Sequence, residues 1–260
     1  MVEALVLAGA LLAYSNGLAL WCIRRGRFPE RLFQRLNPAL IAAMLAYSAA
    51  RYNGSGGPAA VGLHGRGWLR ATVAGACVGL GLALPPLLFF YRPILLDTPM
   101  EYGPIARLTR RQLLREVLVG VPIGIALLEE LAFRGLLYSA LRRCLLARWA
   151  IAGTSAAFAG WHLTVTATSA AQTNISTSAR LPAPLRPFTM PIAVAGGMLS
   201  TGLAGAAFGL LKERTGSLLG PIIAHWVVDG LMIAALWLRS GARARRQGRT
   251  RHTSAVHGAR

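Results

Sequence analysis

Residues 4–23 form a run of twenty residues, from Ala4 to Ile23, without a single charged side chain. A helix needs about 20 predominantly apolar residues to cross the hydrocarbon core of a bilayer, so this run predicts a membrane-spanning helix. Six further apolar runs follow, and the one at 38–50 is short for a span, which leaves a re-entrant segment as its alternative. These runs cover residues 38–50, 71–91, 113–140, 149–168, 190–211 and 217–238.

The fold class follows from these runs and from the scarcity of charge. Only 14% of the residues are charged, whereas soluble domains carry about 25%. The three cysteines are scattered along apolar runs and form no disulfide framework. The sequence therefore predicts an all-α, polytopic membrane helix bundle with seven to eight transmembrane helices, placed as a multi-pass protein in the cell membrane.

The charge balance is strongly basic, with 28 Lys and Arg residues against 9 acids and a net charge of +19. The arginines lie between the apolar runs rather than on one patch. This distribution favours contact with anionic lipid headgroups and argues against nucleic acid as a partner.

Three regions are expected along the chain. Residues 1–112 hold N-terminal membrane helices and loops without a motif that we can assign. Residues 113–238 carry the polar side chains discussed next. Residues 239–260 contain seven arginines and no acid, so we expect a basic, disordered tail.

Six ionisable side chains lie deep inside the apolar runs of the second region, away from the ends of these runs. An ionised group at the bilayer centre costs about 2.5–3.5 kcal/mol on insertion scales, and such groups mark functional sites by default. The six residues are Glu129, Glu130, Arg134, His162, His225 and Asp229.

Helical geometry predicts that these residues meet. A rise of about 1.5 Å per residue places Glu129 and the residues of the two later helices at a similar depth near mid-membrane. Glu130 and Arg134 share a helix face, as do His225 and Asp229, because each pair is spaced i,i+4. Glu129 is rotated by about 100° from Glu130, so one carboxylate can face a cavity while the other pairs with Arg134.

Purely structural interpretations remain open for each feature. Glu130 and Arg134 can form an intrahelical ion pair that lets the helix insert. His162, or the His225–Asp229 pair, can hold helices together through hydrogen bonds. We expect Trp161 to be a packing or interface residue.

The same residue types suit amide hydrolysis, which needs a base near a water molecule and donors that face the oxyanion. Glu129, His162 and His225 can instead supply ligands to Zn²⁺, although the chain has no H-E-x-x-H pair. The expected cofactor is therefore either none or Zn²⁺.

Three short motifs carry a resemblance to a known family. Glu129-Glu130-Leu131-Ala132-Phe133-Arg134 resembles the E-E-x-x-x-R motif of the CAAX-protease and bacteriocin-processing (CPBP) family. The segment from Phe158 to His162 is similar to its F-x-x-x-H motif, and the segment from His225 to Asp229 is similar to its H-x-x-x-N/D motif. The three occur in the family's order, and the resemblance covers about residues 113–238.

The resemblance implies an intramembrane endopeptidase, either of the glutamate type or metal-dependent, that acts on a peptide or membrane-protein substrate. It implies that Glu129 and His162 hold and deprotonate the attacking water, that His225 and Asp229 stabilise the oxyanion, and that Glu130 and Arg134 shape the site. Asp229 stands where Asn is commoner. Asp donates a hydrogen bond only when it is protonated; if it is ionised, it orients His225 or helps to bind a cation.

Two other functions compete with hydrolysis. A non-catalytic membrane scaffold or chaperone of the same fold would bind partner helices without cleaving them. A proton or ion pathway also uses buried acids and histidines, but the sequence shows neither an inverted repeat nor paired broken helices.

Overall fold

The computed structural model describes residues 1–25, 30–91, 97, 98 and 100–257, and within these ranges it contains helices and no strand. The first part of the chain forms three long helices and two short 3₁₀ turns. They are α1 (Val2–Arg25), α2 (Glu30–Arg51), η1 (Asn53–Ser55), η2 (Gly57–Val61) and α3 (Trp68–Tyr91).

The second part begins with the short helix α4 (Gly103–Ala106) and continues with a long composite helix over 110–142. The later elements are α8 (Ala147–Trp161), α9 (Leu163–Ala171), α10 (Ile175–Ser178), η5 (Ala183–Phe188), α11 (Thr189–Thr215) and α12 (Leu219–His257). Gly216 ends α11 in the left-handed conformation, with φ 68°, and its N–H donates to the Lys212 carbonyl, as a helix C-cap requires.

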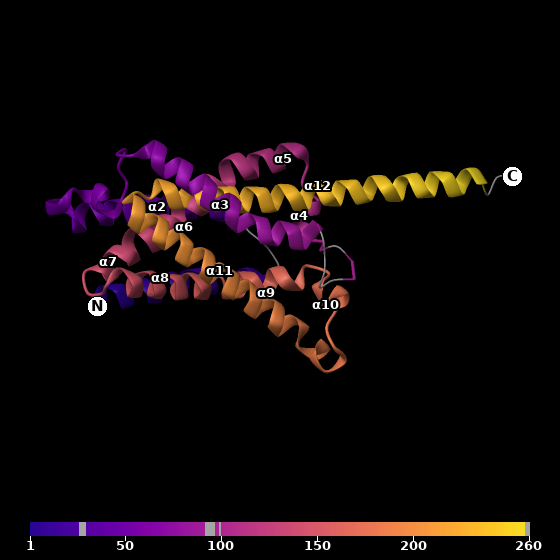
Figure 1. Ribbon diagram of the computed structural model, residues 1–260, viewed down its shortest axis with the longest axis horizontal. Helices are drawn as coiled ribbons and strands as arrows, with labels where there is room; N and C mark the ends of the chain where they lie inside the picture. The colour runs from indigo at the N-terminus through magenta and orange to yellow at the C-terminus, as the bar shows by residue number, and fades with distance from the viewer. Residues whose placement is uncertain (26–29, 92–96, 99, 258–260) are drawn as a thin grey trace.

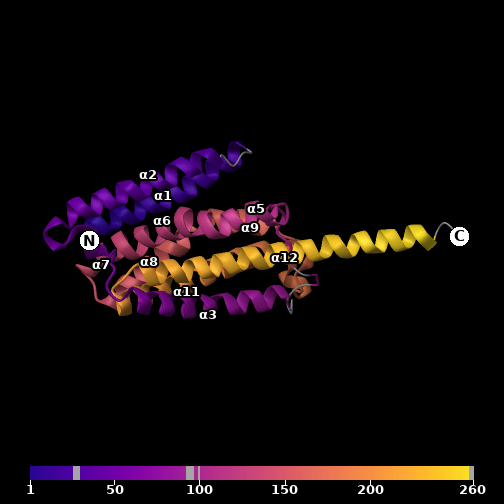
Figure 2. The same ribbon diagram turned by 90° about the horizontal axis from the view of Figure 1, so that it is seen from above.

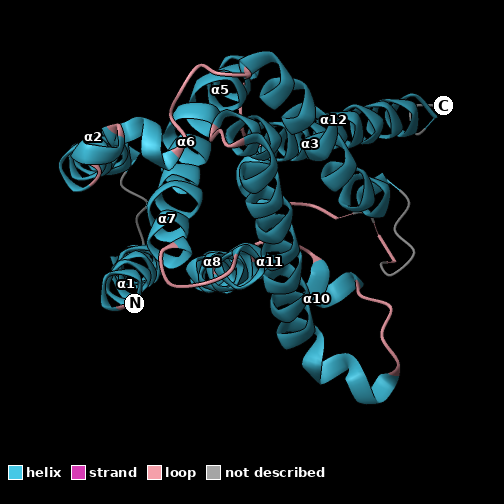
Figure 3. Ribbon diagram, turned by 60° about the vertical axis from the view of Figure 1, so that its left-hand side comes forward, coloured by secondary structure: helices cyan, strands magenta, loops and turns pink. Residues whose placement is uncertain are grey.

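The long helices run back and forth along one axis (Figure 1) and form layers (Figure 2). Helices α1 and α2 form one outer layer, the composite helix with α8 and α9 lies next, and α11, α12 and α3 form the opposite side. Figure 3, turned by 60° from Figure 1, shows α1 and α2 on one side of α6 and α7, with α11 next to α8.

Four described helices are long and apolar enough to cross a membrane: Val2–Arg25, Trp68–Leu88, Ala183–Thr215 and Leu219–Ser240. The protein is therefore an all-α integral membrane protein. The total of seven to eight spans stays a prediction, as does the division into regions at residues 112 and 238.

Helix α2 begins at Glu30 and contains Pro38, so it is longer than the apolar run at 38–50.

The composite helix changes its winding along its length. It passes through α5 (Arg110–Arg115), the π-helical η3 (Glu116–Ala126), α6 (Leu127–Glu130), the π-helical η4 (Leu131–Leu137) and α7 (Tyr138–Arg142). Thr109 caps its first turn with a capping box that involves Gln112. Within η3, the N–H of Leu127 donates to the carbonyl of Pro122, five residues back, which is the wider π-type bond.

Two apolar runs end differently from our expectation. The run at 149–168 is divided between α8 and α9, with His162 at the break. Helix α12 continues past the apolar run at 217–238 to His257 and projects beyond the other helices (Figure 1). The disorder expected for 239–260 stays a prediction.

Helices α3 and α12 pack closely because α3 presents small residues to its neighbour. Ala71, Gly75, Gly79 and Ala83 recur every four residues and are all buried. A Cβ on Gly79 would lie 2.7 Å from the Ala224 carbonyl oxygen and 2.8 Å from the Val227 Cβ. Such small-residue ridges let helix backbones approach in membranes, and this one supports the helix that carries His225.

A pair of alanine substitutions tests this packing. Gly79→Ala should destabilise the protein by about 1–3 kcal/mol, because the added methyl group overpacks the α3–α12 contact. Gly81→Ala is the matched control on the same helix, since a Cβ there meets nothing within 4 Å; it should be neutral or stabilising by up to about 1 kcal/mol. Thermal unfolding in detergent measures both, and equal effects of the two substitutions would contradict the packing.

Candidate active site

Two adjacent carboxylates lie at the centre of the composite helix. Glu129 and Glu130 end α6, between the π-helical segments η3 and η4. Glu129 is 7% exposed, and Glu130 and Arg134 are 0% exposed. Local π-helical winding occurs frequently at functional sites, and here it surrounds the part of the helix that carries the buried charges.

Glu130 is bound from two sides. Its Oε1 accepts hydrogen bonds from Arg134 Nη1 at 3.1 Å and from His225 Nδ1 at 2.8 Å. The first contact joins two turns of one helix, and the second joins the composite helix to α12. Glu130 therefore holds His225 in place, and its negative charge is compensated by Arg134.

The Arg134 side chain lies among aromatic rings rather than in water. Its guanidinium carbon is 4.1 Å from the centre of the Phe158 ring and 5.3 Å from that of Phe208, distances at which cation–π attraction acts. A Cβ on Gly205 would lie 2.9 Å from Arg134 Nη2. The absence of a side chain at Gly205 thus leaves room for the guanidinium group.

Glu129 has a different set of neighbours. Trp161 Nε1 donates to Glu129 Oε1 at 3.0 Å. The second oxygen, Oε2, is buried and has no hydrogen-bond partner in the structure. It lies 3.6 Å from His162 Nε2 and 3.8 Å from His225 Nε2, so three polar atoms from three helical segments converge on one point.

His162 lies at the junction of α8 and α9, with φ −87° and ψ 0°. These angles fall in the bridge region, where many active-site residues occur. His162 Nδ1 is 2.9 Å from the Phe158 carbonyl oxygen. A carbonyl only accepts, so Nδ1 carries the hydrogen and, in the neutral ring, Nε2 is the acceptor that faces Glu129.

Asp229 completes the group at its more open side. Its Oδ2 is 3.4 Å from His225 Nε2, and its side chain is 35% exposed. His225 is thus bordered by Glu130 at one ring nitrogen and by Glu129 and Asp229 at the other. All six residues that the sequence singled out lie in this one cluster.

A metal ion fits the donor chemistry of this cluster but not its spacing. Glu129, His162 and His225 are ligand types that zinc prefers. Within the described part of the chain, however, no group of three His, Cys, Asp or Glu side chains is arranged so that it can hold a metal ion.

Trp161 has a role that the sequence interpretation missed, since it binds Glu129 instead of only packing. Its ring also packs against Phe133 at 5.5 Å and Tyr14 at 5.7 Å. On the other side of Trp161, an apolar hollow of about 260 Å³ lies between α1, α2 and the composite helix. In the sequence, the contact of Trp161 with Glu129 is signalled only by the position of Trp161 directly before His162.

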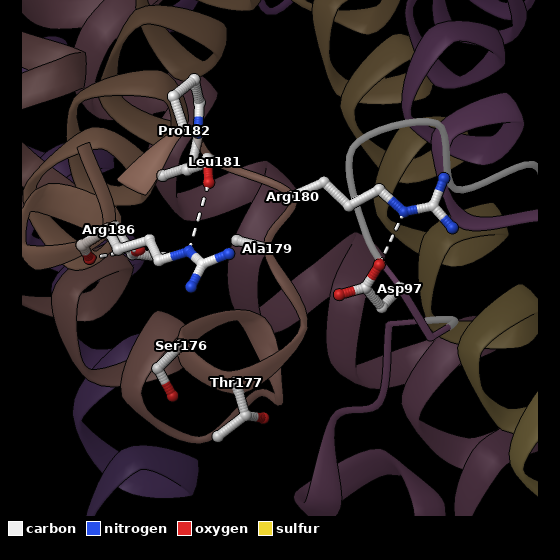
Figure 4. Close-up of a pocket in the computed structure, with 9 residues that line it drawn as sticks. Asp97, Ser176, Thr177, Ala179, Arg180, Leu181, Pro182 and Arg186 are labelled. Atoms are coloured by element: carbon white, nitrogen blue, oxygen red, sulfur yellow. Dashed lines mark hydrogen bonds and ion pairs between the residues drawn. The ribbon is translucent and has the colours of Figure 1, made fainter. Parts of the chain in front are cut away.

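A second hollow, of about 610 Å³, contains none of the six residues. It is polar and joins the region of Asp97 to the segment that follows α9 (Figure 4). Its arginines already have partners, because Arg180 Nε donates to Asp97 at 2.7 Å and Arg186 Nε donates to the Leu181 carbonyl at 3.4 Å.

The comparison with known protein families agrees with this site. Residues 112–231 match the family model described as type II CAAX prenyl endopeptidase Rce1-like. No curated protein and no solved structure matches the chain. The matched segment contains all six clustered residues, and the match confirms the resemblance to CPBP proteases.

Proposed function

We propose that this protein is an intramembrane endopeptidase that hydrolyses a peptide bond with a water molecule activated by Glu129 and His162. The main support for this proposal is the environment of the second carboxylate oxygen of Glu129. Glu129 Oε2 is a buried, unpartnered acceptor that faces a second acceptor, His162 Nε2, at 3.6 Å. A buried polar atom without a partner is costly, and a shared water molecule would satisfy both atoms.

The water-activation step follows from the hydrogen-bond capacities of the two residues. Water has two hydrogens, and it can donate one to Glu129 Oε2 and the other to His162 Nε2. Both acceptors lie within reach of one molecule, since each hydrogen bond is about 2.8 Å long. The lone pairs of the water oxygen then point away from both residues, toward the carbonyl carbon of a bound peptide.

In the reaction, the water oxygen bonds to the carbonyl carbon and Glu129 takes the proton that leaves the water. The carbonyl oxygen becomes an oxyanion. His225, as an imidazolium with a hydrogen on each ring nitrogen, donates to it from Nε2 while its Nδ1–H stays bound to Glu130. Glu129 then passes its proton to the amide nitrogen as the C–N bond breaks. The products are a carboxylic acid and an amine, and transfer of the acid proton to the amine leaves a carboxylate and an ammonium group.

Glu130, Arg134 and Asp229 act on His225 rather than on the substrate. Glu130 fixes the ring through the 2.8 Å contact with Nδ1. Arg134 compensates the charge of Glu130, and Asp229 orients the ring from the Nε2 side. An orienting carboxylate is the role we propose for Asp229 because its oxygen lies 3.4 Å from that nitrogen.

The substrate class that we propose is a peptide segment with a prenylated, CAAX-type end, which the description of the matched family names. We place the enzyme in the cell membrane, with lipid around its apolar helices. A farnesylated peptide with a CAAX end, added to the protein in liposomes, is the direct probe. Comparison of membrane-protein termini in cells with and without the active protein tests for other peptide substrates.

Removal of either water-activating group should abolish cleavage. Glu129→Gln and His162→Ala should each lower the rate by about 10²–10⁴-fold, because general-base catalysis contributes a factor of that size. Cleavage is measured per folded molecule in liposomes. Glu116→Gln, on the same composite helix, and His64→Ala, outside the cluster, are the controls and should keep the wild-type rate.

Wild-type turnover by Glu129→Gln would refute the proposed mechanism. A wild-type protein that cleaves neither the farnesylated probe nor any membrane protein would refute the peptidase assignment itself. In that case the scaffold interpretation predicts that Glu129→Gln still complements a deletion of the gene.

The contact between Trp161 and Glu129 gives a second prediction. Trp161→Phe keeps a ring against Phe133 but removes the donor to Glu129 Oε1. A hydrogen bond to a charged group contributes about 1.5–3 kcal/mol, so kcat should fall by about 10- to 100-fold while KM changes little. Trp149→Phe is the matched control because Trp149 lies on the same helix and is 58% exposed. Equal kcat values for the two variants would exclude the role of Trp161.

We propose that the reaction needs no metal ion, since Glu129 and His162 can bind and deprotonate the water directly. After dialysis against 1,10-phenanthroline and removal of the chelator, the protein should cleave the probe at the untreated rate. Loss of activity that added Zn²⁺ restores would show instead that a metal activates the water. Metal analysis of the dialysed protein serves as the control for complete removal.

A further inference from the structure

The break between α8 and α9 removes a regular helical hydrogen bond next to His162. In an uninterrupted α-helix the N–H of Thr164 would donate to the carbonyl of Gly160, four residues back. Here both groups instead bind the side chain of Asn16 on α1. Asn16 Nδ2 donates to the Gly160 carbonyl at 3.0 Å, and Asn16 Oδ1 accepts from the Thr164 N–H at 3.1 Å.

The carboxamide of Asn16 thus takes the place of the missing peptide partner on each side of the break. Its remaining capacity is also used: Nδ2 donates to the Leu12 carbonyl at 3.1 Å, and Oδ1 accepts from Thr164 Oγ1 at 2.7 Å. The neighbouring Ser15 Oγ donates to the Trp161 carbonyl at 2.8 Å. Backbone groups that would otherwise be unsatisfied in the bundle are therefore capped from α1.

His162 lies inside the turn that Asn16 bridges, between Gly160 and Thr164. Its own ring is held by the bond from Nδ1 to the Phe158 carbonyl at 2.9 Å. With the backbone fixed on both sides, Nε2 is kept 3.6 Å from Glu129 Oε2. Without Asn16, the turn can close into a regular helix, which would rotate His162 away from Glu129.

We propose that Asn16 is a positioning residue for the active site: it holds the helix break open so that His162 faces Glu129. The proposal rests on the proposed hydrolytic function for its catalytic consequence. It also assigns a role to α1, which lies outside the family-matched segment 112–231.

The test uses one disruptive and one mild variant. Asn16→Leu has a similar size and removes every hydrogen bond to the break, and Thr164→Val removes only the 2.7 Å bond from Oγ1. Tyr47→Phe is the matched control. It also deletes a hydrogen bond between α1 and another helix, from the Tyr47 hydroxyl to Glu3 Oε1 at 2.9 Å, but it lies away from the break.

Two measurements are made on each full-length, folded variant in detergent and in liposomes. The first is backbone amide hydrogen exchange over residues 160–166, which does not depend on activity. The second is kcat and KM for the farnesylated CAAX probe. A misplacement of about 1 Å costs roughly 100-fold in rate, so Asn16→Leu should lower kcat by about 10- to 100-fold at nearly constant KM.

The expected result is a changed exchange rate at 160–166 together with a fall in kcat for Asn16→Leu, a smaller effect of the same kind for Thr164→Val, and neither for Tyr47→Phe. Unchanged exchange at 160–166 would overturn the proposal, and so would a wild-type kcat in Asn16→Leu. If Asn16→Leu does not fold, a wild-type kcat in Thr164→Val overturns it.

Failure of the peptidase assignment has a separate signature, because the wild-type protein would then cleave nothing. If the wild-type protein cleaves nothing, hydrogen exchange still tests whether Asn16 holds the helix break. A change confined to 160–166 supports Asn16 as the group that holds the break, and its absence overturns that role.

Discussion

The buried carboxylate of Glu130 is the point on which the centre of this bundle depends. A charge enclosed by apolar helices is tolerated only when it is paired and hydrogen-bonded, and Glu130 satisfies both conditions through Arg134 and His225. These contacts connect the composite helix to α12. Within the described part of the chain, the adjacent carboxylate of Glu129 makes no ion pair with Arg134, and its Oε2 faces His162 at 3.6 Å.

Irregular backbone lies before and after this pair of carboxylates and at the residue that faces Glu129. The helix winds as a π-helix before and after them, and the helix that carries His162 is broken at that residue. Non-helical backbone at membrane depth persists only where protein groups satisfy it. Asn16 does so at the break. Asn37 on α2 similarly donates to the Gly124 carbonyl at 2.7 Å, within the π-helical η3.

Much of the site was predictable from the sequence because ionisable residues in apolar runs are conspicuous and helical rise fixes their depth. Their spacing placed Glu129, His162 and His225 in one slab, and the structure brings both histidines within 4 Å of Glu129 Oε2. The helix break was not predictable. Apart from His162, residues 149–168 are apolar or small, and the groups that stabilise the break lie on α1, about 145 residues earlier in the chain.

Trp161 illustrates the same limit. An indole has the same hydropathy whether it packs against lipid or donates to a carboxylate, so the contact with Glu129 depends on the tertiary arrangement alone.

The central claim is that a water molecule activated by Glu129 attacks the peptide directly. Single-turnover cleavage in water enriched in oxygen-18, followed by mass spectrometry of the product and of the peptide that contains Glu129, measures this most directly. The account predicts one oxygen-18 atom in the new carboxylate of the product and none in Glu129. Oxygen-18 in the Glu129 side chain, with an unlabelled product, would show that the carboxylate itself attacks and would contradict the account.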